Sequence, residues 1–375
     1  MKIGVLTFHR ACNYGTALQA FATVEALKNL GFDAELIDYR PEYTERTLRP
    51  RYLKNARSPK EIASILANRM IYGNQPNEKI RRFLEFVDGM SCGTAVCKSA
   101  QELEAAAQGY DVLLSGSDQL WNFRITGGDL AYCFPFEHPH KVSYGSSFGV
   151  RSISREQQSL LSPLLKQFRV LGLREETALQ LTRQMVGDDY AGKLCRVIDP
   201  TLLLEAEDWK KYRNTSVKLP EGGYILTYYM IETPILRAIT EKLRKETGLP
   251  VVNIKPSKRQ ILCHEGHNMM WAGPREFLSC YAGAKYVVTN SFHGTAFAIN
   301  FEVPMYVAPL PVSMAGEVNS RLVDILDWYD LSDRWIENED AVQKIDLRAT
   351  VDNLKQISRI NREESLQKLK EMLLC

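Results

Sequence analysis

The chain has 375 residues, which is more than one ordinary hydrophobic core accommodates, so two domains are expected. Hydrophobic residues make up 45% and charged residues 25%, the composition of a globular protein. The formal net charge of +2 argues against a protein whose main partner is nucleic acid, because such domains are usually strongly basic. No apolar run reaches the ~18 residues that a membrane-spanning helix needs. Eight scattered cysteines without a CxxC pair, and no export signal at the start, predict reduced thiols and a cytoplasmic location.

The first half of the chain alternates predicted strands with predicted helices. A strand over 2–8 leads through a polar loop into a helix over 17–30, where apolar residues recur at helical spacing, and a second strand follows at 34–39. Further strands are expected at 110–114, 141–144, 170–173 and 197–199. Polar residues follow several of these strands directly, which is where open α/β sheets place their ligand groups.

The second half repeats this alternation. Strands are expected at 224–230, 251–254, 285–289 and 304–308, with helices at 234–247, 274–282 and 295–301 between them. An apolar stripe from Val351 to Leu373 predicts an amphipathic C-terminal helix that packs on the core. The pattern as a whole predicts two α/β domains with parallel sheets, residues 1–204 and 205–375, and a cleft between the carboxyl ends of the two sheets.

Residues 39–82 carry the main concentration of positive charge. Eleven lysines and arginines and four glutamates give this segment a net charge of +7, so the rest of the chain sums to −5. One interpretation is a solvated helical excursion from the N-terminal domain. The other is a surface that meets anionic lipid or a phosphorylated acceptor.

Two side chains at strand-to-helix turns are candidates for chemistry. His293 follows the predicted strand at 285–289, where an imidazole can reach a cleft, although a single histidine is more often structural. Arg174 opens a helix after the strand at 170–173, where its guanidinium suits a carboxylate or phosphate. A surface ion pair between Arg174 and a nearby glutamate agrees with the spacing just as well. The residues alone therefore predict a two-domain α/β enzyme with a cleft for an anionic small molecule.

Several familiar motifs are missing from the sequence. The loop before the helix at 17–30 has one glycine and no G-x-G-x-x-G, so a dinucleotide is not indicated. No G-x-S-x-G turn or phosphate-binding P-loop is present. Cys263, His264 and His267 are close in sequence, but they lack a helical pair of histidines and a second ligand cluster. A polar surface loop is therefore preferred there, and no metal is expected.

Several ordered segments make the sequence recognisable across nearly its full length. They are KIGVLTF from Lys2 with Asn13-Tyr14-Gly15, IDYRP from Ile37, GSDQLWN from Gly116, Ser143-Tyr144 with Phe148-Gly149, Arg174-Glu175-Glu176, DPTLL from Asp199, and TNSFHGT from Thr289. With these segments in this order, the chain resembles the polysaccharide pyruvyl transferase family. The resemblance implies two Rossmann-like domains of the glycosyltransferase-B type.

Members of this family move the enolpyruvyl unit of phosphoenolpyruvate onto two hydroxyls of a sugar, which forms a cyclic pyruvate ketal and releases phosphate. The resemblance implies His293 as a catalytic acid and Arg174 as the contact for the carboxylate or phosphate of the donor. Several members carry an arginine at the position of Ser291, so Arg321 is the expected substitute cation. The implied substrate-binding residues are Asn13, Tyr14, Gly15, Ser117, Asp118, Trp121, Asn122, Ser291, Gly294, Thr295, Asn319, Ser320 and Arg321.

The resemblance also implies a setting for the reaction. The acceptor is expected to be a hexose of a lipid-linked saccharide or of a capsule or exopolysaccharide repeat unit, with phosphoenolpyruvate as donor substrate, no cofactor and no nucleic acid. A cytoplasmic enzyme would meet such an acceptor at the inner face of the cell membrane, where residues 39–82 could make peripheral contact with anionic lipid. Two alternatives stay open: a glycosyltransferase of the same architecture that uses a nucleotide sugar, and a non-catalytic glycan-binding subunit.

Overall fold

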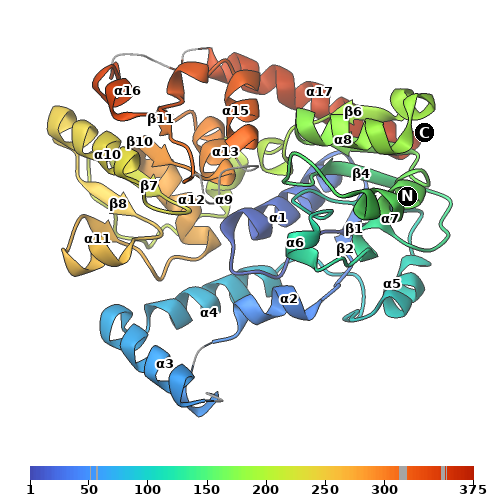
Figure 1. Ribbon diagram of the computed structural model, residues 1–375, viewed down its shortest axis with the longest axis horizontal. Helices are drawn as coiled ribbons and strands as arrows, with labels where there is room; N and C mark the ends of the chain where they lie inside the picture. Colours follow the sequence, from blue (N-terminus) through green and yellow to red (C-terminus); the bar gives the residue numbers. More distant parts are fainter. Residues whose placement is uncertain (51, 56–57, 312–318, 348–350, 352) are drawn as a thin grey trace. The chain divides into compact units, whose positions relative to one another are not determined.

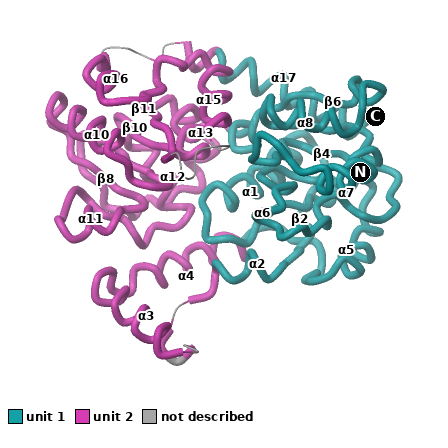
Figure 2. The backbone as a smooth tube through the Cα atoms, viewed as in Figure 1, with its two compact units in different colours: residues 1–47, 89–204, 357–375 teal, residues 48–88, 205–356 magenta. Residues whose placement is uncertain are grey.

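The computed structural model describes residues 1–50, 52–55, 58–311, 319–347, 351 and 353–375. The chain folds into two compact units (Figure 2): residues 1–47, 89–204 and 357–375 form unit 1, and residues 48–88 and 205–356 form unit 2. The chain passes from unit 1 to unit 2 at 204–205, where the sequence places the domain boundary. Two segments differ from the predicted division, because 48–88 belong to unit 2 and 357–375 belong to unit 1.

Unit 1 is built on a sheet of six parallel strands (Figure 1). In chain order they are β1 (Lys2–Leu6), β2 (Asp33–Leu36), β3 (Val112–Ser115), β4 (Lys141–Ser146), β5 (Val170–Leu173) and β6 (Leu194–Arg196). Strands β3 and β4 are buried along their whole length, as expected for a parallel sheet that is covered on both faces. The spatial order is β2-β1-β3-β4-β5-β6. This order reverses direction between β1 and β3, which is the place where α/β sheets of this type bind ligands.

The helices of unit 1 connect these strands. They are α1 (Tyr14–Asn29), α2 (Glu42–Glu45), α5 (Ala100–Ala107), α6 (Phe123–Thr126), α7 (Arg155–Leu165), α8 (Glu176–Val186) and α17 (Leu354–Leu374), with 3-10 helices η1 (Arg46–Leu48), η3 (Ala131–Cys133), η4 (Asp188–Lys193) and η5 (Pro200–Leu202). The first of them, α1, is capped by Asn13, whose side chain accepts a hydrogen bond from the Gly15 N–H at 3.0 Å. Gly31, with a φ of 87°, lets the chain turn after α1.

The predicted C-terminal amphipathic helix is α17, and its apolar stripe packs on unit 1. Leu369 and Leu373 are buried there. Arg362 Nε donates a hydrogen bond to the Leu202 carbonyl at 3.0 Å, which links the helix to the segment after β6. The C-terminal residues therefore return to the unit in which the chain began, because the surface that buries their stripe lies there.

Unit 2 is built on a second parallel sheet. Its strands in chain order are β7 (Tyr224–Tyr228), β8 (Val251–Asn253), β9 (His267–Asn268), β10 (Ala284–Thr289) and β11 (Met305–Val307). The spatial order is β11-β10-β7-β8-β9, so the direction reverses between β7 and β10. As in unit 1, the loops at the carboxyl ends of the two strands at the reversal are the expected ligand-binding loops.

The helices of unit 2 include the basic segment predicted from the sequence. They are α3 (Pro59–Tyr72), α4 (Gln75–Asp88), α9 (Ala206–Lys211), α10 (Pro234–Thr247), α11 (Lys258–Leu262), α12 (Pro274–Gly283), α13 (Phe292–Asn300), α15 (Asn319–Trp328) and α16 (Glu339–Gln343), with 3-10 helices η2 (Leu53–Asn55) and η6 (Ser332–Arg334). Among the described residues, no helix is both long and apolar enough to cross a membrane.

Within the basic segment, α3 and α4 are helical, as predicted, but they belong to unit 2. Helix α3 contacts α11, and α4 contacts α12. Arg82 of α4 is paired with the buried carboxylate of Glu276, and its guanidinium carbon lies 4.5 Å from the ring centroid of Trp271. These partners lie almost two hundred residues further along the chain, so local sequence patterns could not reveal them.

Candidate functional site

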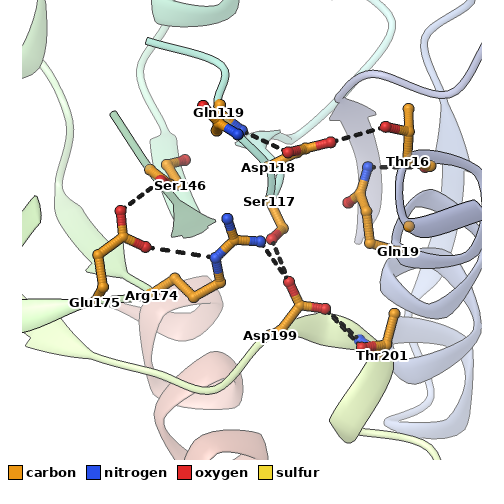
Figure 3. A network of polar contacts seen from close by, with 12 residues as sticks. Thr16, Gln19, Ser117, Asp118, Gln119, Ser146, Arg174, Glu175, Asp199 and Thr201 are labelled. Atoms are coloured by element: carbon orange, nitrogen blue, oxygen red, sulfur yellow. Dashed lines mark hydrogen bonds and ion pairs between the residues drawn. The ribbon is translucent and has the colours of Figure 1, made fainter. Parts of the chain in front are cut away.

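The loops after β1 and β3 are joined by hydrogen bonds where the strand order of unit 1 reverses. Thr7 Oγ1 donates to the Ser117 carbonyl at 2.9 Å, and the Gln19 amide of α1 donates to Thr7 Oγ1 at 2.9 Å. Thr16, in the first turn of α1, donates to Asp118 Oδ2 at 2.9 Å (Figure 3). Thr7, Gln19 and Ser117 are buried, so these bonds hold the two loops together at the carboxyl end of the sheet.

Asp118 has a backbone conformation that costs free energy. Its φ is 82°, in the left-handed region that residues other than glycine rarely adopt. Its second carboxylate oxygen accepts from the Gln119 N–H at 2.8 Å, and its carbonyl accepts from the Ser147 N–H at 3.1 Å. Such a conformation costs on the order of 1–3 kcal/mol and is concentrated at functional sites. The strain, together with the position of Asp118 at the strand reversal, supports it as a ligand-binding residue.

Arg174 lies in a buried cluster of charges at the ends of β5 and β6 (Figure 3). Its Nη1 donates to Asp199 Oδ2 at 2.7 Å, and its Nε lies 3.5 Å from Glu175 Oε2. The other oxygen of Asp199 accepts from the Thr201 N–H at 3.0 Å and from the Thr201 hydroxyl at 2.7 Å. Burial would lower the pKa of Arg174, but the nearby carboxylates of Asp199, Glu175 and Asp118 together raise it. The guanidinium is therefore held in its charged form.

The charges of this cluster do not favour an anionic ligand. One guanidinium faces two buried carboxylates, Asp199 and Glu175. Ser117 and Ser147, which follow β3 and β4, donate further hydrogen bonds to these two carboxylates. The structure contains an ion pair of Arg174, but it is buried rather than on the surface, and its shorter contact is with Asp199 rather than with a glutamate. A donor phosphate at this point would have to displace a carboxylate, so we assign Arg174 to positioning the ends of β3, β4, β5 and β6.

In unit 2, His293 lies in the first turn of α13, directly after β10 and at the reversal of strand order. Ser291 caps α13, because its Oγ accepts from the Gly294 N–H at 3.3 Å. Gly294 packs so closely on β10 that a β-carbon would lie 2.3 Å from Thr289 Oγ1. His293 itself is partly exposed, with its ring edge-on to Phe292 at 5.2 Å between centroids. The cap and the close packing therefore fix the backbone at His293, whose imidazole Nε2 is buried although the residue is partly exposed.

Lys255 lies at the same edge of the unit 2 sheet. Asn290, which follows β10, accepts a hydrogen bond from the Met230 N–H at 2.8 Å and donates one to the Ile231 carbonyl at 2.8 Å. Lys255, which follows β8, donates from Nζ to the Met230 carbonyl at 3.1 Å. The N–H of Met230 is thus hydrogen-bonded to Asn290, in the segment that carries His293, and the carbonyl of Met230 is hydrogen-bonded to Lys255. This places a cation at the sheet edge that also carries Ser291 and His293.

The remaining predicted binding residues are in exposed, capping or core positions. Asn13 is exposed and Ser320 is partly exposed, whereas Tyr14, Gly15, Trp121, Thr295 and Arg321 are buried. Asn122 and Asn319 accept hydrogen bonds at 3.0 Å from the backbone N–H groups of Arg124 and Leu310. Trp121 packs against Phe148 and Phe168 in the core of unit 1. The buried aromatic residues of this set therefore have a packing role in the structure.

Sequence reasoning did not single out Thr16, Gln19, Glu175 or Asp199 as site residues. Glu175 comes shortly after the strand predicted at 170–173, and Asp199 ends the strand predicted at 197–199, which the structure places at 194–196; these positions were the available signal. Thr16 and Gln19 lie on a helix whose spacing gives no indication of hydrogen bonds to two separate loops. The structure places Arg174 in unit 1 and His293 in unit 2, so the two predicted catalytic residues belong to different sheets.

Within the part of the chain that the structure describes, His9, Asp38 and Cys92 form a group whose chemistry would suit a metal ion. Their ligand atoms lie within 4.8 Å of one another, and His9 Nε2 is 3.2 Å from Asp38 Oδ1. Arg40, however, donates to both oxygens of Asp38 at 2.7 Å. Burial would raise the pKa of Asp38, but the hydrogen bonds and charges of His9 and Arg40 hold it well below its usual range. The adjacent guanidinium disfavours a divalent cation, so we interpret the cluster as an ion-pair network.

Comparison with solved structures shows which fold these two units share. The UDP-GlcNAc 2-epimerase from Neisseria meningitidis, bound to UDP-GlcNAc, aligns over 100% of both chains with 11% sequence identity and a TM-score of 0.56. The UDP-GlcNAc 2-epimerase from Methanocaldococcus jannaschii aligns over 97% of this chain and 99% of its own, with 14% identity and a TM-score of 0.52. At such identities the similarity shows the fold alone. It confirms the predicted class, two Rossmann-like α/β domains of the glycosyltransferase-B type.

The sequence itself points to one family. None of the curated proteins matches the chain in sequence. The family model described as polysaccharide pyruvyl transferase matches residues 13–308, a range that includes Asp118, Arg174 and His293. The chain therefore belongs to the polysaccharide pyruvyl transferase family.

Proposed function

We propose that the protein transfers the enolpyruvyl unit of phosphoenolpyruvate onto two hydroxyls of a sugar, which forms a cyclic pyruvate ketal and releases phosphate. Membership of the family supports pyruvyl transfer as the reaction. The observation that carries the proposal is the position of His293, partly exposed at the strand reversal of unit 2 on a capped and tightly packed helix start. Histidine is the side chain most often used for proton transfer in catalysis, and this position is where α/β sheets bind ligands.

The proposed reaction delivers one proton to the donor and removes one from each of two sugar hydroxyls. A proton added to C3 of phosphoenolpyruvate leaves an oxocarbenium-like carbon at C2, which the first hydroxyl attacks as it loses its proton. The bond between C2 and the phosphate oxygen then breaks, and phosphate departs with the electron pair. The second hydroxyl attacks C2, loses its proton and closes the ring. We assign proton delivery at C3 to His293.

The donor carries a carboxylate and a phosphate, so the proposed site needs positive charge. Arg174 is engaged by Asp199 and Glu175, and we therefore assign donor binding to cations of unit 2. Lys255 shares a sheet edge with His293 through Met230. Arg321 lies on α15, which packs on the helix that carries His293. A cation at either position would offset the charge that develops on the departing phosphate.

The test is incubation of the protein with phosphoenolpyruvate and a panel of lipid-linked saccharides. We expect phosphate release that depends on the saccharide, and mass spectrometry should find one pyruvate ketal on the acceptor for each phosphate released. A parallel series with nucleotide sugars checks the alternative activity. Consumption of a nucleotide sugar without use of phosphoenolpyruvate would make the protein a glycosyltransferase. Saccharide binding without phosphate release would make it a glycan-binding subunit.

A further inference from the structure

Helix α3, labelled in Figure 1, carries a stripe of three exposed apolar side chains. Ile62, Leu66 and Met70 are 41%, 46% and 89% exposed. They recur every four residues, so they share one side of the helix within an arc of about 80°. The buried residue of α3 is Ile65, which lies outside this arc. The helix is thus attached to unit 2 along one side and leaves a row of aliphatic side chains uncovered on another.

Exposed apolar residues are concentrated in this part of the chain. Tyr52 and Leu53, shortly before α3, are 44% and 40% exposed. Together with the stripe they place five large exposed apolar residues within residues 52–70. Single exposed apolar side chains are ordinary on protein surfaces, but a contiguous group of them marks a surface that another partner covers.

The same part of the chain carries the positive charge. Residues 48–72 contain six lysines and arginines and one glutamate, a net of +5. Arg51 and Arg57 lie outside the described residues, whereas Lys60 and Arg69 of α3 are exposed.

The arginines of α4 are in a different situation. Arg81 is paired with Glu78 and Glu85, and Arg82 is paired with Glu78 and Glu276. Their charge is offset within the protein. Within the predicted range, 39–82, the exposed lysine and arginine on the same helix as the apolar stripe are Lys60 and Arg69.

We propose that α3 binds the surface of an anionic lipid bilayer. The stripe of Ile62, Leu66 and Met70 enters the boundary between headgroups and acyl chains, while Lys60 and Arg69 meet the lipid phosphates. A helix with an apolar stripe and basic flanks lies in the plane of a membrane interface in this way. A bilayer fits better than a protein partner, because three aliphatic side chains on one helix bury far less area than a specific protein interface requires. The binding is independent of the proposed reaction and needs neither donor nor acceptor.

The experiment is co-sedimentation of the full chain with vesicles of phosphatidylcholine, with and without phosphatidylglycerol, at low and physiological salt. We expect binding that requires phosphatidylglycerol and weakens with salt. The triple variant Ile62→Ser, Leu66→Ser, Met70→Ser should partition at least about tenfold less, because the apolar contribution is lost. The matched control is Leu160→Ser with Ile360→Ser, two residues that are 44% and 42% exposed elsewhere on the chain.

The charge contribution has its own pair of variants. Lys60→Gln with Arg69→Gln should reduce binding to the anionic vesicles, whereas Lys245→Gln with Lys370→Gln, a change of equal charge at exposed positions on α10 and α17, should not. Leu66→Trp provides a readout that does not depend on loss of binding. After the fluorescence of the parent protein is subtracted, lipids brominated in the acyl chains should quench the fluorescence of the tryptophan at position 66. They should not quench the fluorescence that Leu160→Trp adds.

Three results would overturn the proposal. The first is absence of binding by the parent protein to phosphatidylglycerol vesicles at low salt. The second is equal binding by the parent and the stripe variant. The third is self-association in sedimentation velocity that the stripe variant abolishes, which would identify a second copy of the chain as the occupant of the stripe.

Discussion

Arg174 and Asp199 form a buried ion pair, with 2.7 Å between Nη1 and Oδ2, at the carboxyl ends of β5 and β6. Asp199 also accepts hydrogen bonds from Thr201 and from Ser117, the latter after β3. The pair therefore connects segments that come from three separate strand ends. We therefore interpret Arg174 as a residue that positions the site. Its replacement should then affect the stability of the fold, whereas replacement of a ligand contact would affect KM.

Replacement of Arg174 by methionine should lower the free energy of unfolding by about 3–5 kcal/mol, because two buried carboxylates lose their shared cation. Arg174→Lys should retain part of the stability, since it keeps the charge but not the geometry of the guanidinium. Urea denaturation measures both. The control is Arg183→Met, which removes an exposed pair with Asp188 and should cost no more than about 1 kcal/mol. Unchanged stability with a raised KM for phosphoenolpyruvate would instead make Arg174 a donor contact.

Replacement of His293 by alanine should leave the fold intact and lower kcat for ketal formation by roughly 10²–10⁴-fold, the usual effect of removing a positioned acid. The fold should survive because the cap of α13 is made by Ser291, not by the imidazole. Phosphate release at saturating phosphoenolpyruvate is the measurement, and His267→Ala, at an exposed position, is the control. A His293→Ala enzyme with parental turnover would remove His293 from the chemistry.

Replacement of Lys255 by methionine should raise the KM for phosphoenolpyruvate by on the order of tenfold, because a charge-assisted contact with the donor is lost. Lys258→Met, three residues along the chain at an exposed position, should leave KM unchanged. Arg321→Met should raise KM as well if both cations contact the donor. If all three variants kept the parental KM, the anion site would have to lie on other residues.

Replacement of Asp38 by asparagine should reduce the dependence of stability on acid pH. His9 and Arg40 hold the pKa of Asp38 below its usual range in the folded chain, so the carboxylate stabilises the fold at pH values above the unfolded pKa of about 3.9. This contribution is lost as the pH falls from there toward the lower folded pKa. The unfolding free energy of the parent should therefore decline more steeply below about pH 4 than that of Asp38→Asn. Asp33→Asn, at an exposed position in β2, is the control, and parallel curves for Asp38→Asn and the parent would contradict the expectation.

Much of the architecture could be predicted from the sequence because it depends on local spacing. Short apolar runs marked β3 and β5, and the helical spacing after Asn13 marked α1. Polar residues directly after the predicted strands marked the sheet edges at which Asp118, Arg174 and His293 lie. Ordered segments of the family gave the expectation of pyruvyl transfer, and the family match agrees with it.

The partners of the charged residues were decided only by the tertiary structure. The position of Arg174 directly after a strand agrees with an anion-binding role as well as with an ion pair. The structure favours the ion pair, because folding brings Asp199 to Arg174 from the end of another strand. Helix α4 packs on unit 2 because Glu276 and Trp271, the partners of its Arg82, lie there. Helix α17 packs on unit 1 because its apolar residues Leu369 and Leu373 are buried there. Spacing determines which face of a strand or helix a side chain occupies, since that depends on the repeat of the backbone. Which distant charge or surface meets that face depends on how the helices and strands pack together. The backbone repeat of a single element carries no information about that packing.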